Sequence, residues 1–279
     1  MRIALKRVHK SFPQKGQRIQ ALRDINFSIE DGEFVCVIGP SGCGKSSLIS
    51  LIAGLEFPDS GEVFVDSKIV EGPSPDRLVV FQEAALFPWL TVQENVEFGL
   101  KLQRVPKEER RERAFQALKM VHLTRFLDAQ PHELSGGMKQ RAAIARALVM
   151  DPKILLMDEP FAALDAQTRQ MLMEELQDIW QKTKKTIFFV THNVREATFL
   201  SDRVFEISAR PGTMKKEYPI RVPRPRLEQD PHLLMLQGKI MGSLKDEIEK
   251  VAKEQLDDDF RADKAKIVAP AERNLGSNI

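Results

Sequence analysis

A glycine-rich segment over residues 39–46 has the composition and the spacing of a phosphate-binding loop. It fits the pattern G-x-x-x-x-G-K-[ST], and the residues expected around the phosphates are Gly39, Pro40, Ser41, Gly42, Cys43, Gly44, Lys45, Ser46 and Ser47. Glycines allow successive backbone N–H groups to converge on phosphate oxygens, and the start of a following helix adds partial positive charge. We expect Lys45 to reach the β- and γ-phosphates of ATP and Ser46 to bind Mg²⁺.

Four polar residues stand where predicted apolar strands end. They are Gln82 after residues 78–81, Asp158 and Glu159 after residues 154–157, and His192 shortly after residues 187–190. Each has an ordinary alternative, because a loop glutamine, a helix cap or a structural histidine would look the same in isolation. Beside a phosphate-binding loop they predict catalysis, with Asp158 in the Mg²⁺ shell and Glu159 polarising the attacking water. We expect His192 to contact the γ-phosphate, and Gln82 to contact Mg²⁺ and the water.

A second glycine-containing segment, residues 134–141, precedes another predicted helix. Ser135, Gly136 and Gly137 stand at the start of that helix. The N–H groups at a helix start attract anions, so this segment predicts a second phosphate-binding terminus.

Composition and charge narrow the class of protein. The chain has 279 residues, 42% of them hydrophobic, which is enough for one large domain or for a domain with appendages. The net charge of +2 gives no electrostatic support for nucleic-acid binding. Cys36 and Cys43 form no disulfide framework, which fits a reducing cytoplasm, and Cys43 is expected to be a small loop residue. No signal peptide is evident, and the apolar runs are far shorter than the roughly 20 residues that span a bilayer. We therefore expect a soluble protein whose membrane role comes through a partner.

Short apolar runs alternate with helical patterns, which predicts an α/β fold around a buried parallel sheet. The expected strands cover residues 34–38, 78–81, 154–157 and 187–190, and the expected helices include 45–53, capped by Gly54, and 194–200, capped by Asn193.

Residues from about 83 to 153 are mostly helical in character, which predicts a helical subdomain inserted in the sheet domain. Residues 91–94 form a capping box, a charged helix extends from Pro106 to about His122, and residues 136–150 form a third helix.

The main domain is expected to end near residue 220, and residues 221–279 form a tail. The tail begins with a proline-rich, linker-like segment and is helical to about residue 250. Beyond that point we expect a mobile, solvated end, with a regulatory role as the alternative.

From about residue 3 to residue 220 the chain resembles the ATP-binding cassette (ABC) subunits of transporters. The motifs are the phosphate-binding loop, the Q-loop Gln82, the signature at residues 134–140, the Walker B strand with Glu159, the D-loop at residues 163–165, and the switch His192. The resemblance implies a P-loop NTPase (RecA-like) core and places Phe12 where the family stacks an aromatic ring on adenine. It also implies that ATP joins two protomers, either a homodimer or a paired ABC subunit. The signature of one protomer then binds the γ-phosphate held by the other, and Asp165 is counted among the nucleotide-binding residues.

Local segments resemble the nitrate, sulfonate and taurine importer group within that family. The segments are residues 71–73, 76–82, 86–90, 161–169 and 222–226. This resemblance implies a peripheral ATPase at the cytoplasmic face of the inner (plasma) membrane. It would bind a separate permease, which works with a substrate-binding protein to import a small anion or related solute.

Some positions in this resemblance have two interpretations or none. The residues after Gln82, up to about Trp89, should help to form the groove for the permease, although Pro88 and Trp89 could equally be packing residues. Asn193 replaces the usual aspartate and can still cap a helix. Arg195 stands where an acidic residue is common, and nothing in the sequence explains it.

Two other functions stay open. A soluble ABC ATPase acting on DNA or ribosomes would carry a long coiled coil or a second cassette, together with a basic surface, and the sequence shows none of these. An exporter ATPase is disfavoured only by the importer-like segment over residues 71–90.

Overall fold

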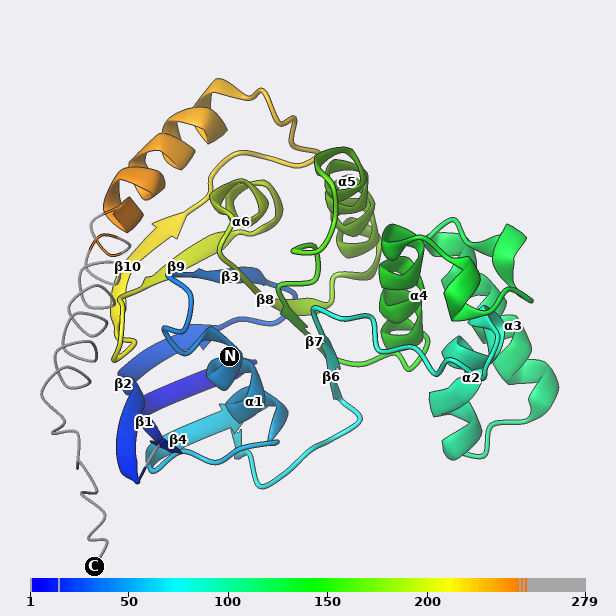
Figure 1. The fold of residues 1–279 in the computed structure, drawn as a ribbon, viewed down its shortest axis with the longest axis horizontal. Coiled ribbons are helices and arrows are strands. Elements are labelled where there is room, and N and C mark those ends of the chain that lie inside the picture. The colour runs from blue at the N-terminus through cyan, green and yellow to red at the C-terminus, as the bar shows by residue number, and fades with distance from the viewer. Residues whose placement is uncertain (1, 15, 246, 248, 250–279) are drawn as a thin grey trace, which may run out of the picture.

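The computed structural model describes residues 2–14, 16–245, 247 and 249, and its main sheet has six strands (Figure 1). The order is β10-β9-β3-β8-β7-β6. The bounds are β3 Phe34–Ile38, β6 Arg77–Val80, β7 Ile154–Asp158, β8 Thr186–Thr191, β9 Arg203–Ile207 and β10 Met214–Pro219. All neighbours pair in parallel except β10 and β9. The predicted α/β fold with a parallel sheet is therefore confirmed.

Both faces of this sheet are buried, because alternate residues of each strand enter different cores. In β3, Phe34, Cys36 and Ile38 belong to one core, whereas Val35 and Val37 belong to the other. This burial on both faces explains why the strands stand in the sequence as uninterrupted apolar runs.

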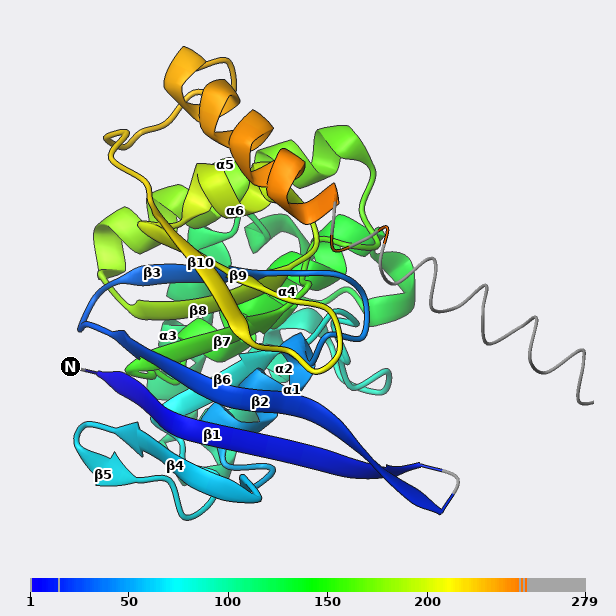
Figure 2. The ribbon, with the colours of Figure 1, turned by 90° about the vertical axis from the view of Figure 1, so that its left-hand side faces the viewer.

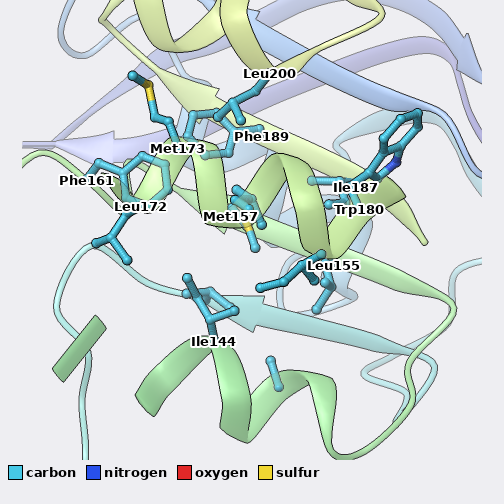
Figure 3. Packing of buried hydrophobic residues seen from close by; sticks show 14 of the residues in the cluster. Ile144, Leu155, Met157, Phe161, Leu172, Met173, Trp180, Ile187, Phe189 and Leu200 are labelled. Atoms are coloured by element: carbon cyan, nitrogen blue, oxygen red, sulfur yellow. The ribbon is translucent and has the colours of Figure 1, made fainter. Parts of the chain in front are cut away.

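Helices cover both faces of the sheet (Figure 1). α5 (Ala166–Thr183) and α6 (Val194–Leu200) pack on one face, over a core in which the rings of Phe161 and Phe189 lie 5.7 Å apart (Figure 3). α1 (Lys45–Ala53) packs on the other face. Each of these helices follows a polar loop that comes directly after a strand of the main sheet.

The limits of α1 and the start of α6 confirm the sequence prediction. α1 begins at Lys45, and Gly54 ends it with a φ of 78° while its N–H donates to Leu51 O at 3.2 Å. Asn193 caps α6, because its Oδ1 accepts from the N–H of Arg195 at 2.9 Å.

A second, antiparallel sheet lies on the other side of α1 (Figure 2). Its order is β2-β1-β4-β5, with β1 Ile3–Gln14, β2 Gln17–Ile29, β4 Ser60–Val65 and β5 Lys68–Ile69. No pattern in the sequence predicted this sheet. Register shifts between Leu5 and Val8 and again before Ser11 interrupt the alternation that identifies a half-buried strand.

The segment between β6 and β7 is helical, as predicted. It contains α2 (Val92–Leu102), α3 (Lys107–Met120), α4 (Gly136–Leu148) and short 3₁₀ turns at Thr124–Phe126 and Pro131–Glu133. α2 and α3 stand apart from the antiparallel sheet (Figure 1). The capping box is present, since Thr91 Oγ1 accepts from Glu94 N at 3.2 Å and Glu94 Oε2 accepts from Thr91 N at 2.9 Å.

Several predicted boundaries were wrong by one or two residues, among them three that were predicted too far along the chain. The strand expected over 78–81 ends at Val80, and Phe81 is half exposed. The helix expected to reach His122 ends at Met120, because His122 has a φ of 56°. The helix expected to reach residue 150 ends at Leu148.

The tail packs on the main domain along one helix. Residues 231–245 are helical, which agrees with the prediction up to that point. Leu233, Ile240 and Leu244 are buried in the core that lies under α5 and α6. The end expected to be mobile, beyond residue 250, lies outside the described residues. Within the described part of the chain, no helix combines the length and the apolar character that a membrane crossing requires.

Arg226 fastens the tail to the domain from a buried position. Its guanidinium donates to the carbonyls of Val222, Thr198, Phe199 and Ser201 at 2.7–3.0 Å, and its backbone N–H donates to Gln177 Oε1 at 3.1 Å. Loss of solvation, with repulsion from Arg224, lowers the pKa of Arg226 to about 9, so that the group still carries its proton at neutral pH.

We predict that Arg226→Met destabilises the protein by about 3 kcal/mol or more, because buried carbonyl oxygens lose their donors. The measurement is urea denaturation of the full chain. Arg221→Met, at an exposed position of the same segment, is the matched control and should change stability by less than about 0.5 kcal/mol. Equal midpoints for the two variants would contradict the anchoring role.

Candidate nucleotide-binding site

A cavity of about 440 Å³ opens where β3 and β7 end at the carboxyl edge of the sheet. Its lining contains most of the predicted phosphate and metal residues together with some that were not predicted. The lining residues are Phe12, Gln14, Ile19, Ala21, Ser41, Gly42, Gly44, Lys45, Ser46, Ser47, Gln82, Asp158, Glu159 and Arg210. Parallel strands bring residues that are distant in sequence to one edge, which is where ligands bind in open α/β sheets.

Lys45 lies buried at the base of this cavity. Its Nζ donates to the carbonyls of Gly39 and Pro40, at 3.0 Å each, and lies 3.5 Å from Glu159 Oε1. These contacts hold the ammonium in place at the start of α1, beside the backbone N–H groups of the loop. The arrangement can bind a polyphosphate.

Gly44 shows why the loop needs glycine at this position. Its φ is 100°, and a Cβ there would lie 2.6 Å from Leu22 Cδ2. The neighbouring Cys43 is buried, and burial raises the pKa of its thiol, so the loop contributes its backbone here and no reactive sulfur.

Glu159 links the ends of β7 and β8. Its N–H donates to Val190 O at 2.9 Å, and its Oε2 lies 2.7 Å from His192 Nδ1. Its residue has a φ of 45°, an unusual conformation for a non-glycine residue. Lys45, Glu159 and His192 therefore form one continuous polar chain, in which a carboxylate stands between two potential cations.

Asp158 and Ser46 form an oxygen pair in the same cavity. Ser46 Oγ lies 3.2 Å from Asp158 Oδ1. Burial raises the pKa of Asp158, and the hydrogen bond from Ser46 partly offsets that rise. Hydroxyl and carboxylate oxygens are ligands that suit Mg²⁺, and Gln82 supplies a further polar side chain to the lining.

One wall of the cavity comes from the β1–β2 hairpin. Phe12 lies in it, with Lys10 Nζ 5.0 Å from the centre of its ring. Gln14, Ile19 and Ala21 complete this wall, and the sequence analysis missed all three. No motif marks them, because they reach the cavity only through pairing of strands that the pattern did not reveal.

The signature residues lie away from this cavity. Ser135 caps α4, accepting from Met138 N at 3.3 Å, and Gly137 packs so closely on Thr168 that a Cβ would lie 2.4 Å from Thr168 Cγ2. Asp165 caps α5, accepting from Thr168 N at 3.0 Å, which lowers the pKa of this carboxyl. Ser135, Gly136, Gly137 and Asp165 are absent from the described residues that line the Lys45 cavity. One chain thus has two separate surfaces that can bind phosphate, the Lys45 cavity and the start of α4 at Ser135.

Comparison with known proteins agrees with this geometry. The family model described as ABC transporter matches residues 22–162. The nitrate import ATP-binding protein of Synechocystis sp. is 52% identical over 80% of this chain and 84% of its own length. The aliphatic sulfonates import ATP-binding protein of Bacillus cereus is 43% identical over 86% of this chain and 95% of its own.

A solved structure shows the same fold. It is a dimeric, post-hydrolysis state of an ATP-binding cassette bound to ADP and Pi, and it is 37% identical, with a TM-score of 0.70. The match covers 79% of this chain and 100% of that one. On these matches and this site, the chain belongs to the ABC transporter family and is an ATPase of the ABC type.

Proposed function

We propose that this ATPase closes as a dimer around ATP and drives the import of a small anion or related solute through a separate membrane permease. The observation that carries the proposal is the separation of the Lys45 cavity from the Ser135 surface within one chain. Each surface can bind phosphate, and neither contains the parts of the other. A second protomer placed head to tail brings the two together.

The hydrolytic roles are assigned by position. Glu159 polarises the attacking water, since it directly follows β7 and its carboxylate lies beside the buried Lys45. His192 holds that carboxylate from the other side and contacts the γ-phosphate. Lys45 stabilises the charge that develops on the transferred phosphoryl group.

Ser46 and Asp158 are the residues proposed to hold Mg²⁺, with Gln82 at its edge. Their oxygens are hard donors of the kind that this ion prefers. The ion would offset the negative charge of the phosphates, and the protein residues described above would orient the water and the phosphoryl group.

Two observations support the dimer: the start of α4 attracts anions, and a related cassette has been solved as a dimer. Ser135, Gly136 and Gly137 lie at the N-terminus of α4, a helix of 13 residues whose start attracts anions. A related cassette has been solved as a dimer with ADP and Pi. In this proposal the γ-phosphate joins the protomers, and its removal weakens the joint.

α4 also supports a link to a permease. Its Gln140 donates to Phe81 O at 3.2 Å, and its Arg146 donates to Ala84 O and Ala85 O at 2.9 and 2.8 Å. The segment it grips continues to Trp89, whose side chain is 71% exposed. A permease helix seated there would move α4, and with it the signature at the other end of the helix.

The cargo and the location are inferred from the relatives. Proteins named for nitrate import and for aliphatic sulfonates import match most of the chain. We therefore assign a peripheral position at the cytoplasmic face of the membrane, a permease supplied by a substrate-binding protein, and cargo of the nitrate, sulfonate or taurine class. The test is growth of a deletion strain with nitrate as the sole nitrogen source, or with taurine or an alkanesulfonate as the sole sulfur source. Unimpaired growth on all of these compounds would reject the cargo class.

Glu159→Gln should bind ATP and lose hydrolysis by a factor on the order of 10²–10⁴, because the amide cannot act as a base. Size-exclusion chromatography with ATP should then show a dimer, since the joining phosphate is kept. Glu108→Gln, at an exposed position of α3 outside the cavity, is the control and should hydrolyse ATP normally. A monomeric Glu159→Gln protein with ATP bound would count against the shared site.

Lys45→Ala should weaken ATP binding roughly ten-fold or more, because a charge-assisted contact to phosphate is lost. Titration calorimetry of the purified chain measures the Kd. An unchanged Kd would overturn the assignment of this cavity as the nucleotide site.

Ser135→Arg should abolish hydrolysis while ATP still binds to the isolated protomer, because the bulky cation blocks closure and leaves the Lys45 cavity intact. The measurements are steady-state ATPase rate and calorimetry on the same preparation. Normal turnover by this variant would mean that one protomer suffices.

A further inference from the structure

We propose that Arg210 is an additional phosphate-binding residue of the ATP cavity, and that Glu247 of the C-terminal helix holds the loop that presents it. The proposal rests on the placement of ATP in the Lys45 cavity. It gives the tail a direct structural route to the nucleotide.

The loop that carries Arg210, residues 208–213 between β9 and β10, is fixed against the phosphate-binding loop. Gly212 N donates to Ala21 O at 2.8 Å, and Gly212 O accepts from Arg23 N at 2.9 Å. A Cβ on Gly212 would lie 2.2 Å from Cys43 O. The loop therefore lies in contact with both β2 and the phosphate-binding loop, and it has little freedom to shift against them.

Arg210 reaches from this loop to the cavity. Its Nε donates to Gly42 O at 2.7 Å, and its Nη2 lies 2.8 Å from the position that a Cβ of Gly42 would occupy. Its side chain is exposed and lines the cavity. A guanidinium has five N–H donors, and this hydrogen bond to Gly42 engages one of them.

Among the charged residues of the lining, Arg210 is the cation best placed for a further phosphate contact. Lys45 and Arg210 are its cations, and Asp158 and Glu159 are its acids. Lys45 is already held by two carbonyls and by Glu159. Arg210, beside the loop and exposed, is the cation whose planar donor array can engage phosphate oxygens when ATP enters.

Glu247 holds the residue next to Arg210. It is buried, its Oε2 accepts from Ala209 N at 2.9 Å, and its Oε1 lies 3.0 Å from Lys215 Nζ. A second tie joins the same helix to β9, since Ser243 Oγ donates to Glu206 Oε1 at 2.8 Å. The helix runs beside β10 (Figure 1), so its docking fixes the backbone from which Arg210 projects.

The first test separates a phosphate contact from mere support of the loop. Arg210→Gln keeps a donor for Gly42 O and removes the charge. We expect the Kd of the full chain for a non-hydrolysable ATP analogue to rise roughly ten-fold, with an unchanged melting temperature. Arg210→Lys should recover part of the affinity. The loss should shrink at high salt, as expected for a charged contact.

Three comparisons make the outcome decisive. Arg125→Ala, an exposed arginine away from the cavity, should bind normally. If Lys45→Ala loses affinity and Arg210→Gln does not, the proposal for Arg210 fails and the cavity assignment stands. If neither loses affinity, the nucleotide lies elsewhere and both fail.

The second test asks whether Glu247 acts through Arg210. Glu247→Ala should raise the Kd roughly five-fold, and Glu247→Gln, which keeps an oxygen for Ala209 N–H, should restore most of the affinity. In an Arg210→Gln background, Glu247→Ala should have no further effect on the Kd. An equal effect in both backgrounds, or no effect of Glu247→Ala on the Kd even where it lowers the melting temperature, would overturn the positioning role.

Discussion

Burial of the Lys45 ammonium at the edge of the sheet sets the positions of the groups around it. A buried charge is tolerated only when it is paired and hydrogen-bonded, and here two loop carbonyls and Glu159 do this. The carbonyls require the loop to curl around the amine, which in turn requires a left-handed Gly44. Glu159 can reach it only because β7 ends beside the loop, and it brings His192 from β8 with it. The parallel order of the strands thus brings together the groups that pair with the buried Lys45 ammonium.

α4 connects the signature residues at its start with the segment that follows β6. Ser135 and the two glycines lie at the start of α4, and Gly137 packs against α5. Further along the helix, Gln140 and Arg146 donate hydrogen bonds to backbone carbonyls of the segment that follows β6. A rigid helix of this length cannot move at one end only. In the proposed transport cycle, α4 would therefore link a permease bound near the exposed Trp89 to the phosphates held by a partner protomer.

Local sequence patterns predicted much of the fold and of the nucleotide site. The phosphate-binding loop, the helix after it and the polar residues at strand ends follow from local composition, since each strand is buried on both faces and each loop has a fixed chemistry. The antiparallel sheet did not follow, because bulges break its alternation. Arg210 did not follow either: it meets Gly42 across 168 positions of sequence, through a loop that carries no recognisable pattern. Contacts of that kind depend on tertiary packing, and no local pattern encodes them.

Arg226 has a consequence for where the ATPase unit ends. It binds the carbonyls of Thr198 and Phe199 in the last turn of α6 and that of Ser201 just after it, where backbone carbonyls have no donor within the helix. The tail therefore supplies the C-terminal cap of the helix that begins just after His192. A fragment cut at residue 220 would retain every motif of the family and yet leave that helix uncapped in the interior. The unit of folding therefore extends past the last sequence motif of the family, His192, and a design that grafts or truncates this cassette should keep the chain at least through Arg226.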